Sequence, residues 1–265
     1  MVNLLIAAAL AAATPTPAPP SATPAEPAMF VVRDADTTVY IFGTFHALDG
    51  QSQWFGAQVR GAFEQSNELV LETLIPERPM LPGQFSRQMI PASVTPSASF
   101  LASTRMAISA GRSQGMQVDN GADMVLRHFA QAEGKSVEGL ETLDAQLSMF
   151  NRMPSAASAP APKPGQPAAE NQMESLSHAM AEMQSAWKRG DQSVFVHMLD
   201  QLNRASPDTY RMMFTERNDR WADWIRARMQ TPGTVFVAVG AGHLAGKDSL
   251  LVRLAERGIP SQRVN

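Results

Sequence analysis

Cysteine is absent from the 265 residues of this chain. Its absence excludes disulfide bonds, thiolate metal ligands and a cysteine nucleophile together. Only histidine, aspartate and glutamate side chains are left for metal binding or acid–base chemistry.

An excess of positive charge is lacking too, because 22 Lys and Arg stand against 25 Asp and Glu, for a net charge of −3. A nucleic-acid partner is therefore not expected, since such a partner needs a basic surface. The hydrophobic share of 44% at this length is enough for one sizeable core. We expect one main domain.

The apolar run at the N-terminus, Leu4–Ala13, is too short to cross a bilayer but long enough for a signal-peptide core. Small residues at Ala11–Ala13 suit a cleavage site, although "MVN" carries no basic residue. Residues 1–27 are thus a signal peptide or a disordered Pro/Ala-rich leader, and residues 28–265 are the domain. We expect a periplasmic or otherwise extracytoplasmic location, no transmembrane helix, and N-terminal membrane association if the signal is not cleaved.

The first part of the domain predicts a β-hairpin around the polar turn Asp34–Asp36, leading into Gly43. A helix is expected over 52–67, followed by a strand over 68–73, "ELVLET". The helix prediction depends on the spacing of four apolar residues, Trp54, Phe55, Val59 and Phe63. A strand, a helix and a second strand make a parallel crossover, which indicates an α/β fold.

The middle of the chain is mainly helical in pattern, and a strand-like run at 136–142 ends in acid Glu141. A Pro/Ala-rich stretch at 153–171 predicts a flexible surface insertion. The strongest strand is 233–243, and 262–265 allows a last one. Helices are expected at 85–90, 97–111, 122–135, 143–153, 173–191, 192–203, 207–230 and 249–258. The predicted fold is α/β, a central mixed sheet with flanking helices and a helical middle region.

Two similar turns, "GTFH" at Gly43–His46 and "GAGH" at Gly240–His243, each follow an apolar strand. Ligand sites of open α/β sheets collect beyond the carboxyl ends of the strands. Glycine in such a turn permits a positive φ and a close approach of the backbone to a bound group. The two imidazoles would hold a divalent metal ion with a carboxylate, for which Glu72 and Glu141 are candidates.

Simpler interpretations stand beside this one. A histidine at a strand end is often a hydrogen-bonded structural residue, and glycine after a strand is often only turn chemistry. His128, His178 and His197 lie in predicted helices and read as surface or packing residues. The H-E-x-x-H, G-x-S-x-G, P-loop and G-x-G-x-x-G patterns are all missing.

Arg217 is the remaining candidate, on a predicted helix that leads toward the second glycine–histidine turn. An arginine there would clamp a substrate carboxylate or stabilise a developing oxyanion. The alternative is a salt bridge to an acid at the edge of the core, with Trp221 and Trp224 as packing residues.

Seven motifs, in this order, together resemble the TraB/PrgY/GumN family, which includes the Tiki proteases and groups with the erythromycin-esterase and ChaN-like proteins: "YIFGTFH", "ELVLET", "GADMVL", "VEGLETLDAQL", "AWKRGD", "ERNDRW" and "VAVGAGHLAG". The resemblance implies that His46, His243, Glu72 and Arg217 converge, with Gly43 and Gly240 shaping the turns and Glu141 as a further acid. Tiki members are described as metal-dependent proteases.

Two functions remain open on the sequence. The first is a metal-dependent hydrolase, most plausibly a peptidase, in which His46 and His243 hold Mn, Co or Zn. Glu72 would be a third ligand or the general base for the metal-bound water, and Arg217 would steady the tetrahedral intermediate. Its activity is expected to fall below about pH 6, because imidazole ligands must be neutral. The second is a non-catalytic periplasmic protein that sequesters a peptide or small ligand in the same cleft.

Overall fold

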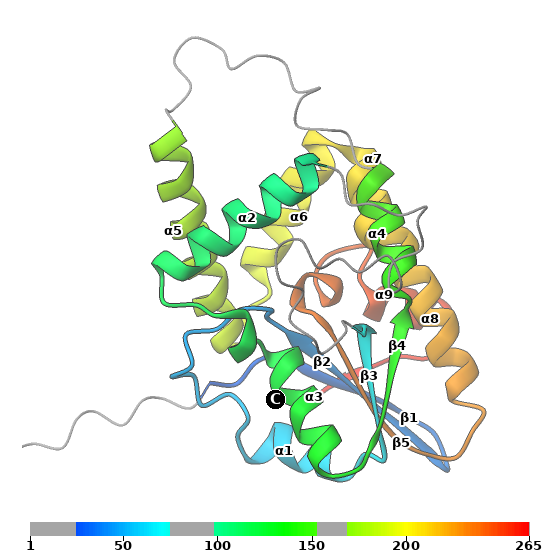
Figure 1. Cartoon of the computed structure of the whole chain (residues 1–265). Coiled ribbons are helices and arrows are strands. Elements are labelled where there is room, and N and C mark those ends of the chain that lie inside the picture. Colours follow the sequence, from blue (N-terminus) through cyan, green and yellow to red (C-terminus); the bar gives the residue numbers. More distant parts are fainter. Residues whose placement is uncertain (1–24, 75–97, 153–168, 265) are drawn as a thin grey trace, which may run out of the picture.

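A computed structural model describes residues 25–74, 98–152 and 169–264 (Figure 1). Most of the predicted leader, the helix expected at 85–90 and residues 153–168 of the predicted insertion lie outside the described residues. The part that is described forms an α/β fold with one mixed sheet, as the sequence predicts.

The sheet has six strands in the described part of the chain, in the order β4-β3-β5-β2-β1-β6. Its four strands β4, β3, β5 and β2 run parallel, and β1 is antiparallel to both of its neighbours, β2 and β6. The bounds are β1 (Met29–Arg33), β2 (Thr37–Thr44), β3 (Glu68–Thr73), β4 (Ser136–Glu141), β5 (Gly233–Gly240) and β6 (Gln262–Arg263). The predicted hairpin and parallel crossover are both present, with β5 inserted between β2 and β3.

Both faces of the sheet are covered by apolar layers, because successive strand residues point to opposite sides. In β2, Phe42 belongs to one core cluster, whereas Val39 and Ile41 belong to the other. In β3, Leu69 and Leu71 join the first cluster and Val70 the second. This alternation also determines which polar side chains of β3 face which helix.

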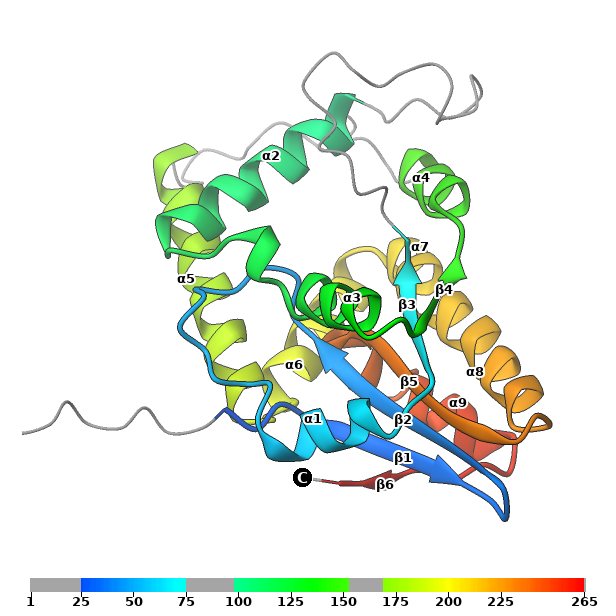
Figure 2. The same cartoon turned by 60° about the horizontal axis from the view of Figure 1, so that its bottom comes forward.

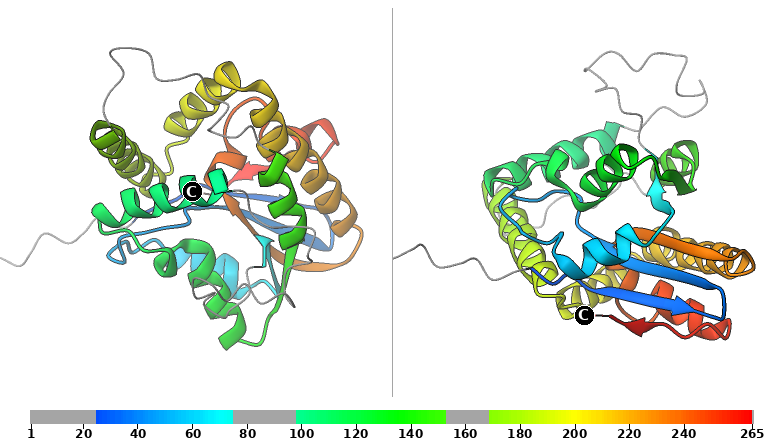
Figure 3. Two further views of the ribbon diagram at one scale, coloured as in Figure 1. Left: turned by 45° about the horizontal axis from the view of Figure 1, so that its top comes forward. Right: turned by 90° about the horizontal axis from the view of Figure 1, so that it is seen from below.

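Helices cover both faces of the sheet (Figure 3). The first face carries residues of α1 (Ala57–Glu64), α3 (Ala122–Ala132), α5 (Ala169–Lys188) and α6 (Ser193–Ala205). The second carries α8 (Glu216–Arg228) and α9 (Leu250–Glu256). The remaining helices are α2 (Ala98–Ser113), α4 (Leu143–Arg152) and α7 (Pro207–Tyr210). Helix α2 packs against α5, and both extend beyond the carboxyl ends of the parallel strands (Figure 2).

Three helix predictions differ from the structure. Helix α1 begins at Ala57 rather than near residue 52, yet Trp54 in the preceding loop is still buried, stacked on Phe42 at 5.5 Å between ring centroids. Helix α5 starts at Ala169, inside the expected insertion. Helical spacing alone did not reveal where α1 begins, because a buried loop residue such as Trp54 leaves the same apolar pattern as a helical one.

The helix expected at 207–230 is divided. A π-helical turn, η3 (Arg211–Thr215), separates α7 from α8. Such turns inside helices are often found at functional sites, and this one ends two residues before Arg217. Among the described residues, no helix is long and apolar enough to cross a membrane.

Candidate functional site at the carboxyl edge of the sheet

Every residue that the sequence singled out for chemistry lies at one edge of the sheet. His46 follows β2 by two residues, Glu72 is in β3, and Glu141 ends β4. His243 lies in η4 (Ala241–Leu244), a short 3-10 turn directly after β5. Because β2, β3, β4 and β5 are parallel, their carboxyl ends meet at this edge.

Glu72 faces helix α8 because it shares the face of Val70, two residues earlier in β3. On that helix Arg217 is buried, with 4% of its surface exposed. Its Nη2 donates to Glu72 Oε2 at 2.9 Å, and its Nε donates to Glu141 Oε2 at 3.0 Å. The arginine therefore joins the ends of β3 and β4 through two carboxylates.

The rest of the Arg217 guanidinium is also held by protein groups. Nη1 donates to the carbonyl oxygen of Met213, in the π-helical turn, at 3.3 Å, and to His243 Nε2 at 3.0 Å. The guanidinium carbon lies 4.5 Å from the centre of the Trp221 ring, a cation–π contact. Four of its five N–H groups thus point to protein acceptors, which fixes the arginine in place.

The carboxylate of Glu72 is held ionised. Its Oε1 accepts the backbone N–H of Gly240 at 2.6 Å, in addition to the ion pair with Arg217 at Oε2. Burial by itself raises the pKa of Glu72, but the neighbouring His243 ring, the charges of Arg217 and His46, and the Gly240 N–H lower it to about 2. Glu72 is therefore an anion at any pH near neutrality.

The tautomer of His243 follows from its neighbours. Arg217 can only donate, so His243 Nε2 accepts, and the proton of the neutral ring is on Nδ1. Nδ1 donates to Asn218 Oδ1 at 2.7 Å, and Asn218 Nδ2 donates to the carbonyl oxygen of Asp248. Both ring nitrogens of His243 are therefore engaged in hydrogen bonds.

His243 is also held neutral by its surroundings. The ring is buried between Phe214 and Trp221, with ring centroids 4.9 Å and 4.4 Å away. Burial is the main cause that lowers the pKa of His243 to about 3; the charge of Glu72 opposes it, and the charges of Arg217 and His46 add to it. His243 is thus a neutral acceptor for Arg217.

His46 lies on the other side of Gly240 and is more exposed, at 62% of its side chain. Its Nδ1 is 3.1 Å from Asp123 Oδ1, near the start of α3. Desolvation lowers the pKa of His46, but the charge and hydrogen bond of Asp123 and the charge of Glu72 outweigh it and raise the pKa to about 9. Nε2 carries no protein hydrogen bond among the described residues.

Gly240 is the point at which the two histidine regions meet. A Cβ atom at this glycine would lie 3.1 Å from Glu72 Oε1 and 3.4 Å from His46 Nε2. It would also lie 3.8 Å from His243 Cδ2. The missing side chain therefore keeps open the space that the carboxylate and the exposed imidazole share.

The expected metal ligands do not form a metal-binding group as their side chains lie. Within the described ranges, no group of three or more His, Cys, Asp or Glu is placed to hold a metal ion. Both nitrogens of His243 are engaged, and the Arg217 cation occupies the side of Nε2 that an ion would need. The divalent ion on His46, His243 and Glu72 stays a prediction.

Gly43 and Gly240 shape the two turns through close packing rather than through a positive φ. Neither Gly43 nor Gly240 has a positive φ, so the conformational freedom of glycine is not the reason for either. A Cβ at Gly43 would lie 3.3 Å from the Ala241 Cα, and the Gly43 carbonyl accepts from Trp187 Nε1 at 2.7 Å. Gly43 thus permits close packing of β2 on the turn after β5, whereas Gly240 borders the shared space.

Sequence reasoning missed Asp123, Asn218 and Trp221 as members of the site, although all three lie inside motifs that carry the family resemblance. Asp123 is in "GADMVL", and Asn218 and Trp221 are in "ERNDRW". Trp221 packs in the core, as expected, but it also contacts both Arg217 and His243. The other three histidines are exposed on helices, as predicted: His128, His178 and His197.

The fold and the site define an α/β protein with a charged, partly buried cluster at the carboxyl edge of a mixed sheet. The chain belongs to the TraB/PrgY/gumN family, whose model matches residues 28–107 and 86–263. Comparison with curated proteins and with solved structures gave no significant match.

Proposed function

We propose that this protein is a hydrolase, a peptidase, in which His46 transfers the proton at the carboxyl edge of the sheet. One observation carries the proposal. His46 has its Nδ1 fixed by Asp123, while its Nε2 faces the space beside Gly240 and Glu72. A carboxylate that orients an imidazole, with the other nitrogen turned to the substrate, is the arrangement of a general base.

The chemical step needs a water molecule and an amide carbonyl beside Nε2 of His46. The water oxygen forms a bond to the carbonyl carbon, and the proton of the water passes to Nε2. When the C–N bond breaks, the same proton passes to the leaving amine, so the imidazole returns to its neutral form. His46 must start neutral, so kcat/KM is expected to rise with pH up to about 9, the pKa of this ring.

This pH dependence replaces the one expected from the sequence, a loss of activity below about pH 6. That expectation assumed that both histidines titrate near their ordinary pKa. The pKa of His243 is lowered to about 3 and that of His46 is raised to about 9. A kcat/KM that falls as the pH is lowered from about 9, rather than from about 6, therefore supports proton transfer by His46.

The buried residues hold the site in position. Arg217 fixes Glu72 and Glu141 at the strand ends, and the Glu72 charge helps to raise the pKa of His46. Among the described residues, one Nη2 hydrogen of Arg217 has no acceptor and is available to a developing oxyanion. Arg217 and Glu72 thus act mainly as positioning residues.

The test is a peptide-library assay on the purified protein, with and without chelator and with added Mn, Co or Zn. We expect His46→Gln to lower kcat at least about 100-fold, the usual contribution of general acid–base catalysis. Turnover that is unchanged in His46→Gln contradicts the role of His46. Metal content measured on the parent protein, His46→Ala and His243→Ala tests the divalent-ion prediction separately.

Gly240→Ala is the matched variant for the shared space. Its φ of −52° and ψ of 136° are allowed to alanine, so the backbone is not strained. The new methyl group lies between Glu72 Oε1 and His46 Nε2, and we expect about a tenfold loss of kcat/KM with little change in stability. Gly61→Ala, where a Cβ meets nothing within 4 Å, is the control.

A second function, non-catalytic binding of a peptide or small ligand, is favoured by the hydrogen bonds that hold four of the five N–H groups of Arg217 on protein acceptors. An ion cluster held in this way is a fixed binding surface without any reaction. This alternative predicts binding that persists in chelator and no turnover of any peptide. The extracytoplasmic location remains a proposal, tested by fractionating cells that express the full chain.

A further inference from the structure

A groove opens directly beside His46, between the loop after β2, helix α2, the turn before α3 and helix α5. Its volume is about 500 Å³, within the range of roughly 300–1,000 Å³ that ligand pockets occupy. The apolar residues that line it, called here the His46 groove, are Ala47, Ala107, Ile108, Met116, Val118 and Met180. One candidate catalytic side chain thus belongs to the wall of a mainly apolar groove.

The apolar wall is exposed to an unusual degree. Ile108 is 36% exposed and Val118 45% exposed, and few other large apolar residues are exposed in the described part of the chain. Exposed apolar side chains that gather in one depression mark a binding surface. They come from two separate elements, α2 and the turn η1 (Val118–Asn120).

The position of the groove wall relative to His46 is fixed by the backbone. Leu48 and Gln117 exchange two hydrogen bonds, from Leu48 N to Gln117 O at 3.2 Å and from Gln117 N to Leu48 O at 2.9 Å. This bridge holds the loop that carries His46 against the segment that carries Val118. The distance between the imidazole and the apolar wall is therefore set by main-chain contacts.

Charge does not select the occupant of the groove. The charged side chains of its lining are the cations Arg112 and His46 and the anion Asp119, and His46 is already paired with Asp123. Opposite charges on one rim attract neither an acidic nor a basic ligand strongly. Recognition must therefore come from apolar contact.

We infer that the His46 groove binds an apolar side chain of a peptide substrate, of the size of leucine or methionine, next to the bond presented to His46. The inference rests on the proposed function, because it assigns a substrate class to the same site. The continuity of the groove with His46 is what makes a substrate side chain its occupant.

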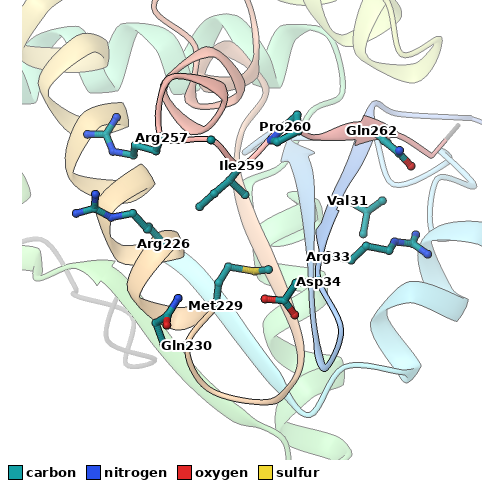
Figure 4. Close-up of a pocket in the computed structure, with 11 residues that line it drawn as sticks. Val31, Arg33, Asp34, Arg226, Met229, Gln230, Arg257, Ile259, Pro260 and Gln262 are labelled. Carbon is teal, nitrogen blue, oxygen red and sulfur yellow. The ribbon is translucent and has the colours of Figure 1, made fainter.

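Another cavity of similar volume, about 490 Å³, lies at the opposite edge of the sheet. Figure 4 shows that its arginines do not converge: Arg226 and Arg257 lie on one side and Arg33 on the other, with guanidinium groups turned apart. Because its polar groups do not converge, this cavity defines no ligand. The His46 groove differs, because the imidazole of a candidate catalytic residue lines it.

Binding is tested first without turnover, in the His46→Gln background. Two acetylated pentapeptide amides, Ala-Ala-Leu-Ala-Ala and Ala-Ala-Ser-Ala-Ala, are titrated by NMR. We expect the leucine peptide to bind about tenfold more tightly, and Ile108→Ser to remove most of that preference. Met106→Ser is the matched control, since Met106 lies on the same helix, is 44% exposed and does not line the groove.

Catalysis is tested second, with His46 present and the same pair of peptides. Ile108→Ser is expected to raise KM for the leucine peptide about tenfold and to leave kcat within about twofold, since it removes binding and not chemistry. Val118→Ser gives an independent variant of the other wall should Ile108→Ser fold poorly, as judged by thermal unfolding.

The outcomes separate the two proposals. A leucine preference that depends on Ile108, without turnover of any peptide, supports the groove and contradicts the hydrolase. Turnover that depends on His46, with leucine and serine peptides bound and cleaved equally well, contradicts the groove alone. Equal effects of Ile108→Ser and Met106→Ser also overturn the inference.

Discussion

The ion cluster at the carboxyl edge of the sheet and the surface pair Arg226–Asp223 at the amino edge use charge in opposite ways. At the carboxyl edge, Arg217, Glu72, Glu141 and His243 are almost entirely buried and bonded to one another. At the amino edge, Arg226 is 59% exposed and pairs with a similarly exposed Asp223 at 3.4 Å. The cavities beside the two edges are nearly equal in volume, about 500 and 490 Å³.

The difference shows that the volume of a cavity does not identify a site. Burying a charge costs free energy unless partners compensate it, so a buried cluster exists only where the fold supplies every partner. At the carboxyl edge four strand ends and α8 supply them. The pair of Arg226 and Asp223 at the amino edge is exposed, so water can replace either partner and the pair is held less firmly.

Replacing Arg217, the central cation of the carboxyl edge, should give the largest difference in stability between the two edges. Arg217→Met leaves Glu72 and Glu141 buried without their main partner, and we expect a loss of about 3–5 kcal/mol in the free energy of unfolding. Arg226→Met at the amino edge should cost less than about 1 kcal/mol. Denaturant unfolding of both variants measures the contrast, and equal losses would mean that burial does not distinguish the edges.

Lowering the pH should have the second-largest effect on stability, through His243 at the carboxyl edge. The folded pKa of His243 is about 3 and the ordinary value is 6.5, so the unfolded chain binds this proton more readily. The stability associated with neutral His243 is complete above pH 6.5 and is lost as the pH falls toward 3.

The expected loss for His243 is about 2–4 kcal/mol between pH 6.5 and 4. Urea unfolding at a series of pH values measures it. His243→Gln should flatten that dependence, and His197→Gln, an exposed position on α6, should leave it unchanged. A pH dependence that survives in His243→Gln would assign it to another group.

The exposed part of the carboxyl edge should show the smallest effect on stability. His46 has a pKa raised to about 9, so the stability from its pair with Asp123 is present below pH 6.5 and is lost as the pH rises through 9. The ring is 62% exposed, so this contribution is less than about 1 kcal/mol.

NMR titration measures the His46–Asp123 pair directly, since stability is a weak probe of it. Asp123→Asn should lower the pKa of His46, because the charge of Asp123 is the chief cause that raises it. Asp223→Asn, which removes an acid from the amino edge, should leave it where it is. A His46 pKa that stays near 9 in Asp123→Asn contradicts the pairing.

Much of the fold could be predicted from local patterns. Periodicity and turn residues predict the hairpin, the parallel crossover, the strand at 233–240 and the helix expected at 173–191. Helix ends were less accurate: Trp54 and Phe55 fit a helical spacing but precede α1, and the π-helical turn η3 interrupts the predicted helix at 207–230. Both depend on packing against distant residues.

The candidate site divides in the same way. The sequence by itself determined that His46, Glu72, Glu141 and His243 follow or end strands, and parallel strands bring such positions to one edge. Only the tertiary structure decided their states, because a pKa depends on burial and on charges remote in sequence. Arg217 and Trp221 pack around His243, which is a neutral acceptor. His46 ends a similar turn but is exposed, and the charge of Asp123 raises its pKa.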